Sequence, residues 1–326
     1  MRYAPPFLKM LETIMLERIV GPILPVALVI LLGYLAGKRG RLNHADSLVI
    51  SRVVLGWIFP ALLLVSMAAT PRSQLFDVKL ISATFVGIMG MYLLSLLLGW
   101  LSSRELKAAT LKGFVTAYPD AAFMGIPILQ VMFGAGSIYT VLVLNVIASL
   151  LMIPLTTMLL TVAAGDSNGW NAFRDSLWQA VRRPLLWAPA LGILCSLLEL
   201  KLPPMLAESF NLMGKATPGV SLLCLGLIMS SEPMKLSREV WGNLGLKLLL
   251  QPALMIAAIL MFGARGTYAQ QMILLAALPS ATIPAMFANE AGTYKNEAAT
   301  TILVSTVLSV ITFPIAIYLI DGGLAG

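Results

Sequence analysis

Apolar residues run in long blocks along the whole chain, and short polar connections separate the blocks. Ten blocks approach the ~20 residues with which a helix crosses the hydrocarbon core of a bilayer. We expect membrane spans at residues 19–37, 47–68, 78–101, 108–133, 137–163, 184–200, 205–230, 239–262, 268–289 and 297–320. Lipid offers no hydrogen-bond partners to a backbone, so blocks of this length favour helices over open strands. The pattern therefore predicts an all-α polytopic membrane protein.

The longest polar connection divides the chain into two units of five spans each. It covers residues 165–183, and we expect a cytoplasmic linker there with an amphipathic surface helix at 171–181. The first five-helix unit would occupy residues 19–164 and the second residues 184–326. Residues 1–18 contain prolines and glutamates rather than the apolar core of a signal peptide, which predicts a short interfacial segment.

The two units share a spacing of prolines and glycines. The matched pairs are Pro25 with Pro184, Gly33 with Gly192, Pro60 with Pro218, Pro119 with Pro279, and Pro154 with Pro314, at offsets of 158 to 160 residues. Since five is an odd number of spans, the second unit would enter the membrane upside down. Inverted repeats of this kind are typical of secondary transporters, whose binding sites lie near the membrane midplane between the copies.

Two matched spans, the fourth and the ninth, carry proline near their middles. The stretches are "TAYPDAAFMGIP" at 116–127 and "LPSATIP" at 278–284. Proline interrupts a helix, and the freed backbone groups persist in a membrane only where protein or a water-filled cavity satisfies them. We expect breaks at Pro119 and Pro279 that cross at mid-membrane. Ordinary proline kinks are the alternative.

Asp120 and Ser280 follow these prolines and are suitable N-caps for the half-helices beyond. The positive ends of the half-helices would favour an anion such as a carboxylate. A carboxylate at midplane itself costs at least ~2.5–3.5 kcal/mol on insertion scales, and serine would cap at lower cost. We therefore interpret Asp120 as an ionisable group that binds the coupling ion and also caps the half-helix that follows it.

Other polar residues interrupt the apolar runs. Lys247 in the eighth span could hold an anionic substrate or neutralise Asp120, and Lys215 in the seventh could do the same. Snorkelling or bonding to backbone carbonyls is the alternative for both, and Lys112 is expected to snorkel. Asn145 in the fifth span could line a cavity or bond a neighbouring helix.

The composition and charge narrow the function classes. Only 11% of the 326 residues are charged and 59% are hydrophobic, against ~25% charged in an average soluble domain. The net charge of +7 arises mostly in the connections, which indicates membrane topology rather than nucleic-acid binding. The connections on one side of the membrane carry 11 Lys or Arg residues, and those on the other side, together with the N-terminal segment, carry 7. The more basic side is expected to face the cytoplasm, which places both termini outside.

Enzyme signatures are not evident in the sequence. It has a single histidine, His44, no phosphate-binding glycine loop, and two cysteines, Cys195 and Cys224, without metal-ligand spacing. We therefore expect neither an enzyme nor an ATP-driven pump, with no cofactor and no metal.

Three stretches resemble the auxin efflux carrier family, which includes plant PIN-type carriers and bacterial malonate and malate permeases. "AYPDAAFMGIPIL" at 117–129 resembles its Asn-x-x-Phe-x-Gly-x-Pro signature. "LPSATIPAMFANEAGTYKNEAATTILVSTVLSVITFP" at 278–314 resembles its C-terminal pattern, and "PVALVILLGYLAGKRGRL" at 25–42 resembles its first span.

The resemblance implies ten spans in two inverted five-helix repeats, similar to bile-acid symporters and sodium/proton antiporters. Spans 1, 2, 6 and 7 would form a scaffold, often dimeric, and spans 3–5 and 8–10 a transport domain that moves like an elevator. The positions that it implies for the substrate site are Pro119, Asp120, Phe123, Asn145 and Pro279. Aspartate stands where the signature has asparagine, and an ionisable group there favours coupled transport over an uncoupled mechanism.

These observations predict a secondary transporter of a small carboxylate, malonate being one candidate, coupled to H+ in a bacterial inner membrane. The predicted substrate-binding residues are Pro119, Asp120, Phe123, Asn145, Lys247, Pro279 and Ser280, with Asp120 as the coupling-ion residue. A Na+-coupled symporter or cation/proton antiporter of the same fold is one alternative. A membrane sensor or accessory subunit that binds a ligand without moving it is another.

Overall fold

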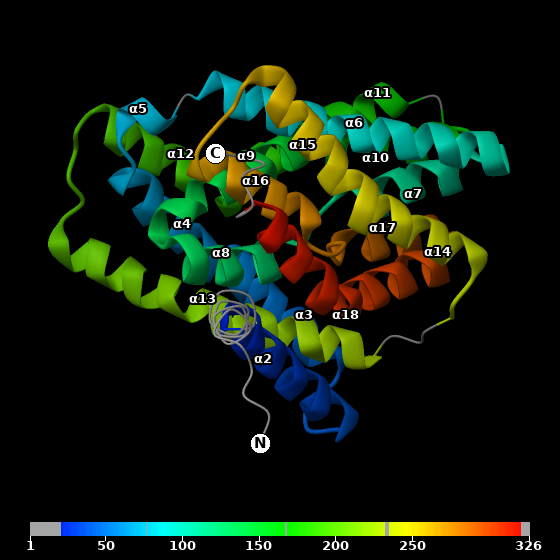
Figure 1. Ribbon diagram of the computed structural model, residues 1–326, viewed down its shortest axis with the longest axis horizontal. Helices are drawn as coiled ribbons and strands as arrows, with labels where there is room; N and C mark the ends of the chain where they lie inside the picture. The colour runs from blue at the N-terminus through cyan, green and yellow to red at the C-terminus, as the bar shows by residue number, and fades with distance from the viewer. Residues whose placement is uncertain (1–20, 76, 167, 232–234, 321–326) are drawn as a thin grey trace, which may run out of the picture.

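The computed structural model describes residues 21–75, 77–166, 168–231 and 235–320, so the predicted interfacial segment at 1–18 lies outside the described residues. Within these ranges the chain is all-helical (Figure 1). The helices are α2 (Gly21–Lys38), α3 (His44–Val53), α4 (Phe59–Ala69), α5 (Arg72–Leu75), α6 (Val78–Ser103), α7 (Leu106–Ala117), α8 (Ile126–Phe133), α9 (Ile138–Ile147), α10 (Ile153–Ala163), α11 (Gly169–Arg182), α12 (Pro184–Leu197), α13 (Pro204–Ser231), α14 (Arg238–Gly245), α15 (Gln251–Phe262), α16 (Thr267–Ala277), α17 (Ile283–Ala291) and α18 (Lys295–Leu319), with a short 3₁₀ turn at Ala135–Ser137.

The described residues confirm the prediction of an all-α polytopic membrane protein. Six helical segments are long and apolar enough to cross a membrane: Ala45–Ala69, Val78–Ser103, Ile138–Ala163, Pro204–Ser230, Arg238–Phe262 and Lys295–Tyr318. Shorter apolar helices cover Leu24–Lys38, Ala121–Phe133 and Pro184–Leu197. The helix expected at 171–181 is also confirmed, because α11 spans this part of the linker.

Four prolines in the apolar helices follow a widened π-helical turn. The turns are Val54–Ile58, Ala121–Gly125, Ala148–Met152 and Leu246–Leu250, before Pro60, Pro127, Pro154 and Pro252 respectively. Proline has no N–H, and its ring clashes with the carbonyl one turn earlier. A wider turn places that carbonyl away from the ring, so the helix continues past the proline instead of ending there.

Two helix pairs pack so closely that only glycine fits between them. A Cβ on Gly33 of α2 would lie 2.0 Å from the Leu223 carbonyl oxygen of α13, and one on Gly226 would lie 1.9 Å from the Ile30 carbonyl oxygen. Gly192 of α12 meets α4 in the same way. Gly33 and Gly192 are a matched pair in the sequence. The absence of a side chain lets these backbones approach, as small residues do between membrane helices.

The remaining helices share one continuous buried core with these pairs. In Figure 1, α6, α7, α15 and α16 lie away from the crossing of α2 with α13. The Tyr92 hydroxyl of α6 lies 3.0 Å from the Thr156 hydroxyl of α10, and both are buried. The site described below lies where the two groups of helices meet.

Lys112 does not snorkel, contrary to the expectation from the sequence. Its Nζ atom lies 2.8 Å from the Glu239 carboxylate of α14, and its side chain is mostly buried. The Tyr294 hydroxyl donates to the same carboxylate over 2.8 Å. Burial and the nearby Glu239 charge raise the pKa of Tyr294, so the hydroxyl remains protonated and able to donate. The Glu239 carboxylate thus keeps the Lys112 amine inside the protein.

The close approach of α2 and α13 gives a matched test of packing. We expect Gly226→Ala to lower the free energy of unfolding by about 1–3 kcal/mol, because the new methyl group overlaps the Ile30 carbonyl. Gly219→Ala on the same helix has nothing within 4 Å of the added Cβ, so it should be neutral or slightly stabilising. Thermal unfolding in detergent would compare the two, and equal melting temperatures would contradict this account of the α2–α13 contact.

Candidate functional site

Two helices are interrupted near the prolines where the sequence predicts breaks. Helix α7 ends at Ala117, and helical structure resumes at Ala121. Helix α16 ends at Ala277, and α17 begins at Ile283. The residues between them adopt extended conformations at Tyr118 and Leu278, which agrees with the preference of a residue before proline.

The two interruptions pair with each other. Asp120 donates its backbone N–H to the Pro279 carbonyl over 2.9 Å, and Ala281 donates to the Tyr118 carbonyl over 2.9 Å. The result is a single antiparallel bridge between Pro119 and Ser280. Each break therefore satisfies backbone groups that the other leaves without helical partners.

Side chains satisfy further backbone groups at the interruptions. Gln251 Nε2 donates to the Ala117 carbonyl over 2.7 Å, and Lys247 Nζ donates to the Ala276 carbonyl over 3.5 Å and to Gln251 Oε1. Carbonyls at the C-terminal ends of both α7 and α16 thus receive a donor from one turn of the same span.

Ser280 does not cap α17, so this part of the sequence prediction is wrong. Its hydroxyl donates to the Val115 carbonyl of α7, and its backbone N–H donates to Ser305 Oγ over 3.2 Å. Helix α17 begins after Thr282, with no side-chain cap. The interruption around Pro279 is longer than that around Pro119. Ser280 therefore lies too far from the first turn of α17 and braces the opposite chain instead.

Asp120 caps its half-helix, as predicted. Its Oδ1 atom accepts a hydrogen bond of 3.1 Å from the Phe123 backbone N–H. The side chain is 1% exposed, and Oδ2 has no hydrogen-bond partner among the residues that the structure describes. An unsatisfied buried carboxylate oxygen is costly, so its retention points to a role beyond the cap.

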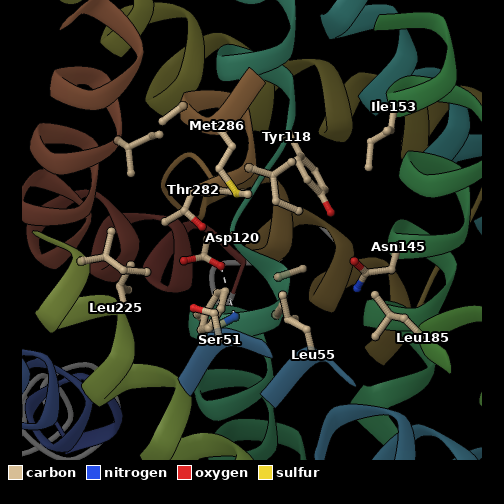
Figure 2. A pocket seen from close by; sticks show the side chains of 18 of the residues that line it. Ser51, Leu55, Tyr118, Asp120, Asn145, Ile153, Leu185, Leu225, Thr282 and Met286 are labelled. Carbon is tan, nitrogen blue, oxygen red and sulfur yellow. Dashed lines mark hydrogen bonds between the residues drawn. The ribbon is translucent and has the colours of Figure 1, made fainter. Parts of the chain in front are cut away.

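A cavity of about 600 Å³ lies on one side of Asp120 (Figure 2). Its wall is mostly apolar and includes Leu55, Ile153 and Leu225. The volume and lining are those of a small-molecule site, which typically measures about 300–1,000 Å³ and carries few polar groups. In Figure 2 Asp120 lies between Ser51 and Thr282, and Asn145 projects from another side of the cavity.

The polar groups of the cavity come from distant parts of the chain. Ser51 belongs to α3, Asn145 to α9, and Thr282 to the second interruption. Asn145 is 2% exposed, and its Nδ2 atom donates to the Val141 carbonyl over 3.0 Å. Arg52 and Arg183 also line the cavity, and both are exposed residues. Two exposed guanidinium groups beside a cavity raise the local concentration of anions.

The predicted site residues divide into two sets. Four line the cavity: Pro119, Asp120, Phe123 and Asn145. The other three, Lys247, Pro279 and Ser280, support the paired breaks and are absent from its lining. Lys215 of α13 is exposed and likewise absent from the lining.

Sequence reasoning missed Tyr118, Ser51, Thr282 and Arg183 as cavity residues. Tyr118 and Thr282 flank the two breaks, so their positions beside the prolines were an available signal. Arg183 ends the linker before Pro184, and in the sequence it counts only among the basic residues that predict the orientation in the membrane. Ser51 lies near the start of the second span and gives no signal of its own, because the packing of α3 brings it to the site. Among the described residues, no group of three or more His, Cys, Asp or Glu side chains could hold a metal ion.

Comparison with known proteins gives a family and several relatives. A family model described as "Membrane transport protein" matches residues 18–317. The chain is similar to "Uncharacterized transporter YfdV" of Escherichia coli (strain K12), with 28% identity over 313 residues, 93% of this chain and 98% of that protein. It is also similar to "Putative malonate transporter" of Rhizobium meliloti (strain 1021), with 24% identity over 94% of this chain and 98% of that protein. A shorter match to "Probable auxin efflux carrier component 3b" of Oryza sativa subsp. japonica is 29% identical and covers 35% of this chain and 21% of that protein.

The cap at Asp120 predicts a difference between two substitutions. Asp120→Asn keeps an oxygen that can accept from the Phe123 N–H, whereas Asp120→Ala leaves that donor without a partner. We expect the alanine variant to be less stable than the asparagine variant by about 1 kcal/mol, the usual contribution of an N-cap. Thermal unfolding of both purified variants measures the difference. An alanine variant as stable as the asparagine variant would mean that the cap contributes nothing.

Proposed function

Because the chain belongs to the membrane transport protein family, which includes the auxin efflux carriers, we propose that it is a secondary active transporter that moves a small organic anion together with a proton. The family and the relatives are transporters rather than enzymes. The observation that carries the proposal is the Asp120 carboxylate, which is buried beside the cavity and has one oxygen without a hydrogen-bond partner in the described part of the chain.

The proposed coupling follows from charge repulsion at Asp120. Two like charges 4 Å apart repel by ~4 kcal/mol at an effective dielectric constant of about 20, which is roughly a thousandfold in affinity. A carboxylate substrate would therefore bind roughly a thousandfold more weakly beside ionised Asp120 than beside the protonated acid. Substrate binding thus favours the protonated form of Asp120. By linkage, protonation of Asp120 tightens substrate binding to the same extent.

The cavity supports an organic anion as the cargo. Its apolar wall suits a carbon skeleton, and Arg52 and Arg183 attract negative charge toward it. One relative bears the name of a malonate transporter, so malonate is a candidate substrate, as are other small mono- and dicarboxylates.

The contacts of Lys247 favour H+ over Na+ as the coupling ion. A sodium ion at the interruptions would seek the carbonyl oxygens that the broken helices leave free. Gln251 and Lys247 already donate to the carbonyls of Ala117 and Ala276. Lys247 is fully buried, and its Nζ atom already occupies the position near the Ala276 carbonyl that a cation would need. A Na+-coupled symporter or cation/proton antiporter remains the alternative of the same fold.

We propose the ten-span inverted-repeat architecture as the frame for this transport. The close pairing of α2 with α13 and of α4 with α12 supports a scaffold built from spans 1, 2, 6 and 7. Spans 3–5 and 8–10, which carry the paired breaks, would then move as an elevator. The scaffold would also form a homodimer, with both termini outside a bacterial inner membrane.

The coupling proposal predicts how Asp120→Asn behaves. A thermal-shift screen of malonate and other carboxylates on the purified wild-type protein first identifies a ligand. Its affinity for the wild type should then fall by up to about tenfold per pH unit as Asp120 ionises, because one proton is linked to binding. The asparagine variant should bind with little pH dependence and should not accumulate the ligand in proteoliposomes on a pH gradient. Uphill accumulation by this variant would show that Asp120 is not the coupling group.

Transport itself is tested by counterflow of the identified ligand. Proteoliposomes of the wild-type protein should exchange labelled for unlabelled ligand at the same rate with or without Na+. A requirement for Na+ would favour the sodium-coupled alternative. Ligand binding without any flux would instead identify a sensor or accessory subunit.

A further inference from the structure

Helix α11 carries a stripe of alternating tryptophan and arginine on its outer face. Trp170, Arg174, Trp178 and Arg182 are spaced four residues apart along Gly169–Arg182. Residues at this spacing lie on one face of a helix, one turn above another. Trp170 is 68% exposed and Trp178 is 58% exposed. Two indoles on one short helix form an outward surface that the described part of the chain leaves uncovered.

The opposite face of α11 packs on the protein. A Cβ on Gly169 would lie 2.4 Å from Val162 Cγ2 of α10, so the helix begins directly against the end of that span. Further along, Thr157 Oγ1 of α10 lies 3.5 Å from Ser176 Oγ, and Ala180 is buried. Pro184 then begins the apolar helix α12. Figure 1 shows α11 beside α10. The stripe is thus held at the end of two apolar helices, where a bilayer surface would meet the protein.

The side chains of the stripe also contact one another and their neighbours. The Arg182 guanidinium carbon lies 4.8 Å from the centre of the Trp178 ring, and the Trp170 and Phe173 rings stack at 5.3 Å. Among the described residues, the only ion pair of the stripe is a 3.7 Å contact between Arg174 and Asp175, both of which are exposed. The arginines therefore keep most of their hydrogen-bond donors available.

We propose that α11 is an interfacial helix whose Trp-Arg stripe binds the anionic phospholipid surface of the membrane. Indole rings favour the headgroup region, where their apolar body and N–H are both satisfied. Guanidinium groups bind phosphate through paired hydrogen bonds, and their charge complements an anionic leaflet. Since Ser176, Ala180 and Arg183 line the large cavity, lipid bound outside α11 would steady the wall of that cavity.

Charge neutralisation provides the first test. The purified full-length chain in neutral detergent is titrated with phosphatidylglycerol while tryptophan emission is followed, with phosphatidylcholine as the neutral lipid. We expect Arg174→Gln combined with Arg182→Gln to weaken phosphatidylglycerol binding by at least about fivefold. The matched control neutralises two exposed arginines of another connection, Arg39→Gln with Arg41→Gln, and should keep the wild-type affinity.

Two outcomes of the titration would overturn the proposal. An equal loss in both double variants would mean that the lipid responds to overall charge rather than to the stripe. Competition by inorganic phosphate at concentrations comparable to the lipid would mean that the arginines bind a soluble anion. Both pairs of substitutions are on exposed side chains, so a loss of folding is not expected, and circular dichroism checks it.

The depth of the indoles provides the second test. In nanodiscs that contain phosphatidylglycerol, the emission lost on Trp178→Phe reports on Trp178 alone. We expect lipids brominated on their acyl chains to quench this component and aqueous acrylamide to quench it weakly. Strong quenching by acrylamide together with none by brominated lipid would place the stripe in water and overturn the proposal. Shielding from both quenchers would indicate another protein surface on α11 and would also overturn it.

Discussion

The antiparallel pairing of two broken helices is the constraint on which the site depends. An interrupted helix in an apolar surrounding leaves donors and acceptors that cost several kcal/mol each if they find no partner. Here each interruption satisfies the other, through the bonds from Asp120 to Pro279 and from Ala281 to Tyr118. Neither break could persist alone, so the two prolines act together. The pairing also holds Asp120 at the edge of a cavity with its backbone fixed.

The two breaks differ in their surroundings, although their sequences are matched. Asp120 caps the turn that follows it and belongs to the lining of the cavity. Ser280 lies behind the crossing and bonds back to α7 at Val115. One break therefore contributes an ionisable side chain to the lining of the cavity, while the other braces it. This division explains why a charge is tolerated at one position only, because a second carboxylate at Ser280 would face a backbone carbonyl with no donor.

Charge is distributed across the interruptions in a way that follows the helix dipoles. The Asp120 carboxylate lies at a half-helix N-terminus, and the Lys247 amine lies near the carbonyl ends of α7 and α16. Among the residues that the structure describes, neither group has a direct ion-pair partner, and each contacts or caps the nearest backbone ends instead. A proton added to or removed from Asp120 therefore changes the charge at the cavity without breaking a salt bridge. Such an arrangement suits a group that must exchange its proton repeatedly.

The sequence by itself determined the features that depend on local chemistry. Apolar block length indicated membrane helices, proline placed the interruptions, and the short side chain after Pro119 identified Asp120 as a cap. The tertiary structure decided everything that depends on contacts between distant segments. In the tertiary structure Ser280 donates to the Val115 carbonyl, and Lys247 donates to the Ala276 carbonyl at the end of α16. Lys112 forms an ion pair with Glu239, and Ser51 and Arg183 line the cavity. A polar side chain in an apolar run must find some partner, but only packing decides which partner lies within reach.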